Sequence, residues 1–362
     1  MALRPDSEPQ PTVGPAPLSS GNPLARLWGR ARGRRQAPAV AVLVVLGALL
    51  PTMTQNVYTI SVAFQVEVMM CLALGLNIVV GYCGLLDLGY AAFFAIGAYT
   101  TAMLSVDLHW PVLATLPIAV VGALVGAVFV GFPTLRLRSD YLAIITLGFG
   151  EIIQNIVDNL SQTGGPGGIV NIPPLQVGGV QVNTTTGYYY VFLFLIVVFA
   201  AATWRVRRSR LGRAWLAIRE DEDTATAMGI KTRRYKLYSY MGGSVIGALT
   251  GSFYAPAIIS ISPQTFGFPE SLLVLMAVSI GGMGSLWGAL LGAGIVVALP
   301  EVLRDFAQAR LLVFGVVLVL VMVLRPQGIW PEHGVGLLNL VRRSWDGMRV
   351  GFRGAGGPGG GA

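Results

Sequence analysis

Residues 58–80 read YTISVAFQVEVMMCLALGLNIVV, an apolar run that contains one charged side chain, Glu67. An α-helix needs about 20 apolar residues to cross the hydrocarbon core of a bilayer. This run is long enough, and the chain contains others like it. Further spans are predicted at 39–56, 85–106, 112–134, 141–160, 188–204, 236–258, 271–299 and 311–324. The pattern predicts an all-α polytopic membrane protein.

The composition argues against a soluble enzyme and against a nucleic-acid-binding protein. Of 362 residues, 54% are hydrophobic and 12% are charged, whereas a soluble domain carries about 25% charged residues. The net charge is +8, but arginines flank the apolar runs, where they orient the chain and attract anionic lipid. No run alternates aromatic and basic side chains as a single-strand-binding surface would. We therefore expect membrane lipid, and no nucleic acid, among the partners.

The cysteines and histidines do not indicate a disulfide framework or a metal site. Cys71 and Cys83 lie in apolar stretches without a Cys-x-x-Cys spacing, and His109 and His333 are isolated. Structural metal sites need several such ligands at close spacing. We expect no metal ion and two packed or lipid-facing thiols.

The sequence divides into a membrane domain, 39–330, and two tails. Residues 1–38 are rich in Pro, Ser, Gly and Arg, which predicts a disordered cytoplasmic tail. Residues 331–362 end in a glycine-rich stretch and are expected to be flexible. The apolar block 271–299 is too long and too glycine-rich for one helix, so with a break there we expect about 9–10 transmembrane or re-entrant helices. The break is predicted at Gly281, Gly282 and Gly284.

Two glycine patterns in the apolar segments are similar. Gly81-x-x-Gly84 in the first half of the chain has the same form as Gly281-x-x-Gly284 in the second half. Corresponding glycine-interrupted segments are typical of transporters built from internal repeats. The alternative is that glycine is simply common in membrane helices.

The basic residues predict the orientation of the chain. Lys and Arg gather in the segment 205–236, whereas 161–187 and 254–270 contain neither. Loops that carry Lys and Arg stay on the cytoplasmic side of a membrane. We therefore expect a cytoplasmic N-terminus and a cytoplasmic loop at 205–236.

Within that loop, residues 209–230 predict a pair of short helices outside the membrane. Apolar residues such as Trp215 and Ile218 recur at helical spacing, Asp221 or Asp223 can cap the second helix, and Gly229 stands where a left-handed cap ends it. The pair can dock into a cleft of a partner, or it can rest as an amphipathic helix on anionic lipid. The candidate coupling residues are Arg219, Glu220, Asp221, Glu222, Ala225, Met228 and Gly229.

Polar side chains inside the apolar runs are candidates for a translocation pathway. A carboxylate in hydrocarbon is costly, so such groups face the bundle interior or a water-filled cavity. The alternative is structural hydrogen bonding between helices. The candidate pathway residues are Glu67, Asn77, Asp87, Tyr90, Glu151 and Asn155.

Four separated motifs resemble the permeases of branched-chain amino acid ABC importers, the high-affinity leucine, isoleucine and valine importers. They occur in the family's order over about 60–330. They are 73-ALGLNIVVGYCGLLDLGYAAFFAIGAY-99, 140-DYLAIITLGFGEIIQ-154 followed by 163-TGGPGGI-169, 212-GRAWLAIREDE-222 with 227-AMGI-230 and 234-RYKL-237, and 325-RPQGIWP-331.

The resemblance implies a type II-like ABC importer permease and its partners. These are a second related permease, two cytoplasmic ATPases and an external solute-binding protein. The chain lacks the Walker A pattern Gly-x-x-x-x-Gly-Lys-[Ser/Thr], so we expect no enzyme activity and no cofactor in this chain, with ATP bound by the partner subunits. The loop around 220–229 corresponds to the helix that docks on the ATPase. It departs from the importer pattern Glu-Ala-Ala followed by Gly, because it reads 223-DTATAMG-229.

The expected function is therefore the movement of branched-chain amino acids across a bacterial plasma (inner) membrane. Two alternatives remain open. A permease of the same architecture can carry urea or short amides. An ion-coupled secondary transporter would instead use Glu67, Asp87 and Glu151 to relay protons.

Overall fold

The computed structural model describes residues 47, 51, 56–134, 139–177, 179–302, 315, 316, 319 and 328–330. The predicted tails 1–38 and 331–362 lie outside the described residues, as do most of the predicted spans 39–56 and 311–324. The chain separates into a unit of residues 1–49 and a unit of residues 50–362. The fold described below is that of the second unit.

The second unit consists almost wholly of helices, joined by short loops and one small hairpin. The hairpin is formed by β1 (Leu175–Val177) and β2 (Val180–Val182), which pair antiparallel. The α-helices are α2 (Val57–Leu76), α3 (Ala91–Val106), α4 (Val112–Thr134), α5 (Ser139–Asn159), α6 (Thr185–Arg208), α7 (Arg210–Glu220), α8 (Glu222–Ala227), α9 (Thr232–Ile258), α10 (Phe268–Gly281) and α11 (Leu286–Val302). The shorter helical turns are η1 (Asn77–Tyr82), η2 (Ser161–Thr163), η3 (Gly165–Gly167) and η4 (Pro263–Phe266).

Five of these helical segments are long and apolar enough to cross a bilayer. They are Val57–Tyr82, Val112–Phe132, Tyr141–Asn159, Thr185–Arg208 and Pro263–Gly281. The helices α3 and α11 are apolar but shorter. The predicted all-α polytopic membrane fold is therefore confirmed.

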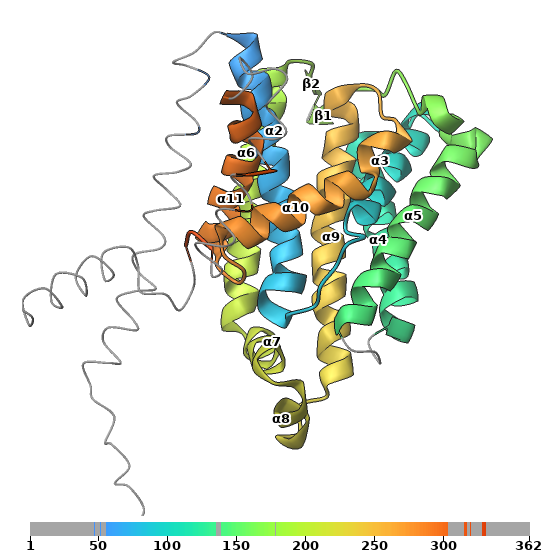
Figure 1. Ribbon diagram of the computed structural model, residues 1–362. Coiled ribbons are helices and arrows are strands. Elements are labelled where there is room, and N and C mark those ends of the chain that lie inside the picture. Colours follow the sequence, from blue (N-terminus) through green and yellow to red (C-terminus); the bar gives the residue numbers. More distant parts are fainter. Residues whose placement is uncertain are drawn as a thin grey trace, which may run out of the picture. The chain divides into compact units, whose positions relative to one another are not determined.

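The predicted span 85–106 begins later than its apolar pattern suggested. After η1 the backbone is not helical from 84 to 89, and α3 starts only at Ala91. Two local features account for the interruption. Gly84 has φ 74°, which breaks a helix, and Oδ1 of Asp87 accepts a hydrogen bond from Gly89 N–H at 2.9 Å. Such a local bond competes with the helical ladder. Figure 1 shows this segment as a loop between α2 and α3.

The predicted break in the block 271–299 is confirmed. Helix α10 ends at Gly281, and α11 begins at Leu286. Between them Gly282 has φ 119° and Gly284 has φ 84°. These are backbone conformations that glycine adopts at low cost and other residues do not.

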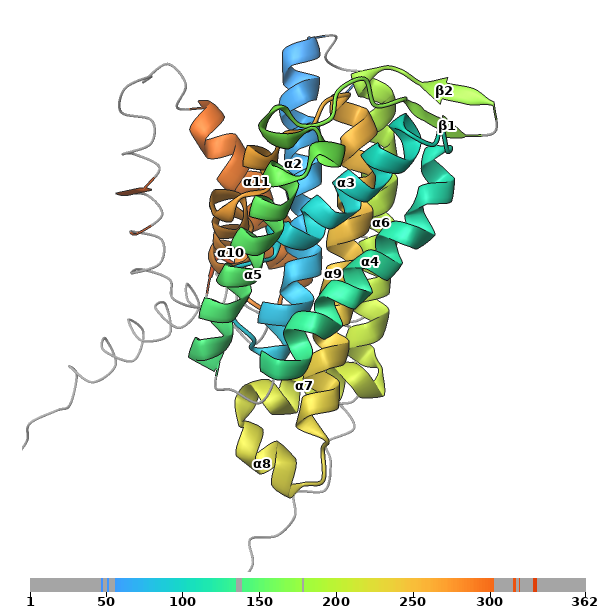
Figure 2. The same cartoon turned by 90° about the vertical axis from the view of Figure 1, so that its right-hand side faces the viewer.

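Helix α9 packs against α2, α3 and α4 at the centre of this unit (Figures 1 and 2). Its contact with α3 is very close, because a Cβ on Gly97 would collide with the backbone of Ala248. At the same crossing Oγ of Ser252 donates to the Gly97 carbonyl at 3.1 Å. Small residues and hydroxyl bonds of this kind are how helices associate in lipid.

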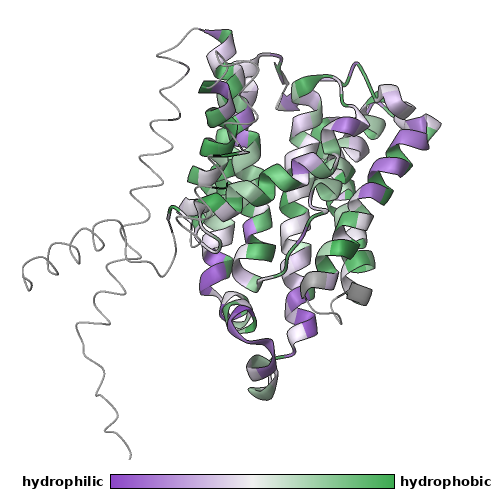
Figure 3. Ribbon diagram, in the orientation of Figure 1, coloured by the Kyte–Doolittle hydropathy of each residue, from purple (hydrophilic) through white to green (hydrophobic). Residues whose placement is uncertain are grey.

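The two ends of this unit differ in character. The pair α7–α8 lies at one end and the β1–β2 hairpin at the other (Figures 1 and 2). Figure 3 shows hydrophobic residues along the helices and hydrophilic ones at the end of α6 that leads into α7. The helix pair predicted at 209–230 is therefore confirmed, and it stands outside the apolar helices.

Candidate coupling and translocation site

The first helix of the pair, α7, is fixed to the chain's own membrane helices. Its predicted apolar face is confirmed, since Ala214, Trp215 and Ile218 are all buried. The indole Nε1 of Trp215 donates a hydrogen bond of 2.7 Å to the carbonyl of Tyr235 in α9. The apolar face of α7 is thus covered by protein, which argues against a helix whose apolar face rests on lipid.

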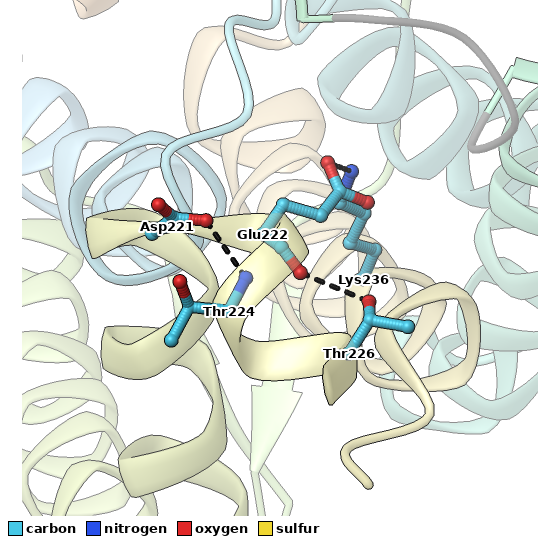
Figure 4. A network of polar contacts seen from close by, with 5 residues as sticks. All are labelled: Asp221, Glu222, Thr224, Thr226 and Lys236. Carbon is cyan, nitrogen blue, oxygen red and sulfur yellow. Dashed lines mark hydrogen bonds and ion pairs between the residues drawn. The ribbon is translucent and has the colours of Figure 1, made fainter. Parts of the chain in front are cut away.

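The second helix, α8, begins and ends at residues whose caps the sequence predicts. Of the two candidates at its start, Asp221 forms the cap, because Oδ1 accepts a hydrogen bond from Thr224 N–H at 2.8 Å (Figure 4). That backbone hydrogen bond lowers the pKa of the Asp221 carboxyl. At the other end Gly229 has φ 84°, and the N–H of Ile230 reaches the carbonyl of Ala225 at 3.1 Å. This is the glycine-ended motif expected of a helix C-terminus.

An ion pair attaches α8 to α9. A carboxylate oxygen of Glu222 lies 2.5 Å from Nζ of Lys236, whose side chain is 5% exposed while that of Glu222 is 44% exposed (Figure 4). The backbone carbonyl of Glu222 also accepts a hydrogen bond from the Thr226 hydroxyl at 2.9 Å. Glu222 therefore positions α8 within the chain, and it keeps part of its surface open to solvent.

The surface that the pair presents centres on one apolar side chain. Met228 is 80% exposed, and no atom lies within 4 Å of a Cβ built on the adjacent Gly229. Ala225, by contrast, is 3% exposed. Ala225 is a predicted coupling residue, but its side chain packs within the chain and is not part of this exposed surface. The remaining predicted coupling residues are exposed: Arg219, Glu220, Asp221, Glu222, Met228 and Gly229.

Four of the predicted pathway residues, Glu67, Asn77, Asp87 and Tyr90, are buried within the chain. The Tyr90 hydroxyl donates to the carbonyl of Gly243 in α9 at 2.9 Å. Asp87 holds the turn before α3 as described above. Both Glu67 carboxylate oxygens are buried without a hydrogen-bond partner among the described residues. Structural bonding thus accounts for Tyr90 and for Oδ1 of Asp87, whereas Oδ2 of Asp87 is buried without a partner among the described residues. Any pathway role of these four residues stays a prediction.

Asn77 joins two parts of the chain that are far apart in sequence. Its Oδ1 accepts a hydrogen bond from Gly284 N–H at 2.8 Å, and its Nδ2 donates to the carbonyl of Ser285 at 3.3 Å. The end of α2 is therefore bonded to the turn between α10 and α11. Sequence reasoning placed Asn77 among pathway residues and missed this contact, for which the similar glycine patterns were the available signal.

The other two predicted pathway residues, Glu151 and Asn155, are exposed on α5. Nδ2 of Asn155 donates to the Glu151 carbonyl at 2.7 Å, and Nδ2 of Asn159 donates to the Asn155 carbonyl at 2.8 Å. These three residues, spaced four apart, form one polar line along the helix, and Figure 3 shows hydrophilic residues on this part of α5. The structure thus places Glu151 and Asn155 together on the exposed side of α5. The same helix packs at Gly150 closely against Gly89, which lies in sequence between the buried residues Asp87 and Tyr90.

The neighbouring helix α4 exposes a surface of a different kind. Its large exposed residues are all apolar, among them Val121, Val125 and Phe129. Such a surface suits hydrocarbon, whereas a carboxylate at Glu151 in the same environment is costly. The surroundings required therefore differ: lipid suits α4, whereas the polar line of α5 needs protein or water, although the same helix also exposes apolar Ile144, Ile152 and Ile156.

Arg219, predicted only as a coupling residue, also forms hydrogen bonds within the chain. Its Nη1 donates a hydrogen bond to the carbonyl of Gly81 in η1 and another, at 3.4 Å, to the carbonyl of Met283 in the α10–α11 turn. The guanidinium therefore points from α7 toward the membrane helices. No pattern in the sequence predicts that Arg219 bonds the carbonyls of Gly81 and Met283.

Comparisons with known proteins show the family to which the chain belongs. The family described as Branched-chain amino acid transport system / permease component matches residues 58–324. The high-affinity branched-chain amino acid transport system permease protein LivM of Escherichia coli K12 is 38% identical over 321 residues, which cover 82% of this chain and 75% of that protein. The corresponding protein LivH of Escherichia coli K12 is 27% identical over 288 residues, covering 71% and 89%. No solved structure matches the chain.

The family match spans α2 to α11 and includes the motifs 73–99 and 212–222, from which the resemblance was inferred. The relatives named as LivM and LivH are both permease proteins. The chain is therefore a multi-pass membrane protein, and it belongs to the family of permease components of branched-chain amino acid transport systems.

Proposed function

We propose that this chain is a permease subunit of an ABC importer that carries branched-chain amino acids across a bacterial inner membrane. Two cytoplasmic ATPases bind and hydrolyse the ATP, a second related permease completes the path, and an external solute-binding protein delivers the amino acid. The observation that carries this proposal is the α7–α8 pair. It lies outside the apolar helices, is fixed to α9 through Trp215 and Glu222, and exposes Met228.

The distribution of basic residues supports a cytoplasmic location for α7–α8. The segment 161–187, which contains the β1–β2 hairpin at the opposite end, has no Lys or Arg. By the positive-inside rule the basic end faces the cytoplasm. The arginines between 26 and 35, which precede the first predicted span, support a cytoplasmic N-terminus by the same rule. The basic residues at the α7–α8 end are Arg205, Arg207, Arg208, Arg210, Arg213, Arg219, Lys231, Arg233, Arg234 and Lys236.

Met228 is the proposed centre of the ATPase contact. Met228 has a large apolar side chain that is 80% exposed at the polar end of the chain outside the membrane helices. Burying such a side chain fully in a partner's cleft is favourable by about 1.5–3 kcal/mol. Gly229 leaves room beside it for the partner backbone. Glu220 and Asp223 are exposed acidic residues of the same helix pair, and their charges would fix register and partner choice.

The polar line of α5 is the proposed wall of the translocation path. Glu151 and Asn155 are exposed in a membrane-spanning helix, where hydrocarbon is unfavourable to them. A water-filled path shared with the second permease gives these groups hydration and gives an amino acid polar contacts of modest strength. Neighbouring α4, with its apolar face, borders lipid.

Reconstitution of the complete complex tests the transport function. We expect proteoliposomes that contain both permeases and the ATPases to take up labelled leucine, isoleucine or valine when ATP and the binding protein are supplied. Uptake of urea or acetamide by the same vesicles would contradict the proposed cargo. Leucine uptake by this chain alone, driven by a proton gradient without ATP, would contradict the ABC mechanism.

A charge at the proposed docking centre tests the ATPase contact. We expect Met228→Asp to reduce co-purification of the cognate ATPases at least tenfold, because a carboxylate replaces the buried apolar contact. The matched control is Leu108→Asp, at a side chain that is 57% exposed in the turn after α3. Equal co-purification with Met228→Asp and the control would rule out Met228 as the docking centre.

A further inference from the structure

The two interruptions of the membrane helices, after η1 and between α10 and α11, meet in the structure. The side chain of Asn77 bonds both Gly284 and Ser285 across this meeting point. The approach is very close, because a Cβ on Gly81 would collide with the backbone nitrogen of Gly284. The similar patterns Gly81-x-x-Gly84 and Gly281-x-x-Gly284 are therefore neighbours in space.

A third segment, 328–330, joins the same junction. The N–H of Ile329 donates to the carbonyl of Ile280 at 2.8 Å, and the N–H of Trp330 donates to the carbonyl of Gly281 at 2.9 Å. These bonds satisfy two of the last carbonyls of α10, which have no partner within the helix. The junction is thus a hydrogen-bonded unit made of three distant pieces of chain.

Arg219 reaches this unit from α7. Its Nη1 donates to the carbonyl of Gly81 on one interruption and, at 3.4 Å, to the carbonyl of Met283 on the other. Arg219 also passes close to Gly84, since a Cβ there would lie 3.0 Å from Cγ of Arg219. One side chain of the proposed coupling element thus contacts both interruptions.

The chemistry of arginine suits this position. Gly81 lies in the last turn of η1, which ends at Tyr82, and Met283 follows the end of α10 at Gly281. Helix C-termini carry partial negative charge and attract cations. A guanidinium has five donors in a rigid fork and can bond two carbonyls at once, whereas a lysine ammonium acts as a compact point charge.

The other fixed contacts of the helix pair lead to α9. Trp215, one helical turn before Arg219 and on the same side of α7, bonds the Tyr235 carbonyl, and Glu222 pairs with Lys236. The pair α7–α8 therefore contacts both α9 and the two interruptions. A displacement of α7–α8 changes the contact between α9 and the two interruptions.

We propose that Arg219 is the positioning residue that transmits movement of α7–α8 to both helix interruptions, so that they rearrange together when the ATPases act. This inference rests on the proposed function, because it presumes that ATPases move the pair. It changes the role of Arg219 from a contact with the ATPase to a contact within the permease. In this proposal Met228 binds the ATPase, and Arg219 transmits the movement of α7–α8 to the two interruptions.

Hydrogen exchange tests the contact in the full-length chain without partners. Arg219→Met keeps much of the side chain's length and removes its donors. We expect backbone amides at 282–286 to exchange at least tenfold faster than in the unaltered protein. The matched control is Arg213→Met, an exposed arginine of the same helix that bonds the Arg208 carbonyl, and it should leave these amides unchanged. Equal exchange in both variants would overturn the proposal, whether or not the chain transports anything.

The ratio of uptake to ATP hydrolysis tests the transmission, which a purely structural role would not change. In the complete complex we expect Arg219→Met to retain ATPase co-purification and ATP hydrolysis while leucine uptake per ATP falls at least tenfold, with partial recovery in Arg219→Lys. A ratio within twofold of the unaltered complex would overturn the proposal. So would loss of ATPase co-purification, because Arg219 would then belong to the docking surface. If the unaltered complex shows no ATP-driven uptake, the proposed function fails and this inference fails with it, although the exchange result still decides the Arg219 contact.

Discussion

Replacement of Asn77 by leucine should destabilise the chain strongly, because Asn77 is fully buried and its amide group bonds two backbone groups of the α10–α11 turn. Leucine has a similar size and no polar atoms. It leaves the buried N–H of Gly284 without a partner, which costs about 1–3 kcal/mol, and it removes the weaker bond to Ser285, worth about 0.5–1 kcal/mol. The expected loss is about 1.5–4 kcal/mol, a factor of about 12–700 in the unfolding equilibrium.

The assay is equilibrium unfolding of the isolated chain in mixed detergent micelles, followed by circular dichroism and tryptophan fluorescence. The matched control is Asn155→Leu, the same substitution at an exposed asparagine whose Nδ2 bonds only the Glu151 carbonyl of its own helix. This control should change the free energy of unfolding by no more than about 0.5 kcal/mol. The reasoning is refuted if Asn77→Leu unfolds like the unaltered protein, or if the two variants lose the same free energy.

Two further predictions concern the α3–α9 crossing and the cap of α8. Gly97→Ala should lower the free energy of unfolding by about 1–3 kcal/mol, because its Cβ meets the Ala248 backbone. Gly148→Ala has no atom within 4 Å of the new Cβ, and it should raise the same free energy by about 0.5–1 kcal/mol. Equal effects of the two alanines in the same unfolding assay would count against the close crossing. For the cap of α8, the pKa of the Asp221 carboxyl in the folded chain lies below its ordinary value of 3.8. The carboxylate therefore stabilises α8 fully above pH 3.8, and this stabilisation is lost as the pH falls through the lower pKa of the folded chain. Protection of the Thr224 amide, corrected for its intrinsic exchange rate, should therefore decrease in acid, whereas Asp221→Asn should show no such dependence. An identical acid profile in both proteins would show that the carboxylate is not responsible.

The local features of this protein follow from the sequence because they depend on near neighbours. The apolar runs predicted helices of membrane-spanning length, and the helices α2, α4, α5 and α6 follow them. Residues at the ends of short helices were equally informative. Asp221 and Gly229 cap α8 as their types and spacing predict, and the glycine cluster near 282 marked a real break.

The start of α3 and the roles of the buried polar residues were less predictable. The apolar pattern predicted a span over 85–106, but a positive φ at Gly84 and the local bond of Asp87 delay the helix to Ala91. A polar residue in an apolar run signals that a partner is needed. It does not say whether the partner is water, solute or backbone, and for Asn77 and Tyr90 it is backbone.

By itself, the sequence determined the class of protein, the order of its helices, the place of its α10–α11 break and the existence of a helix pair outside the membrane. Only the tertiary structure decided that Ala225 is buried while Met228 is exposed, and that Arg219 turns toward Gly81. The physical reason is that helical periodicity shows which residues share a face, but only packing shows what covers that face. The bond from Gly284 to Asn77 joins residues 207 positions apart, a separation that no local pattern encodes.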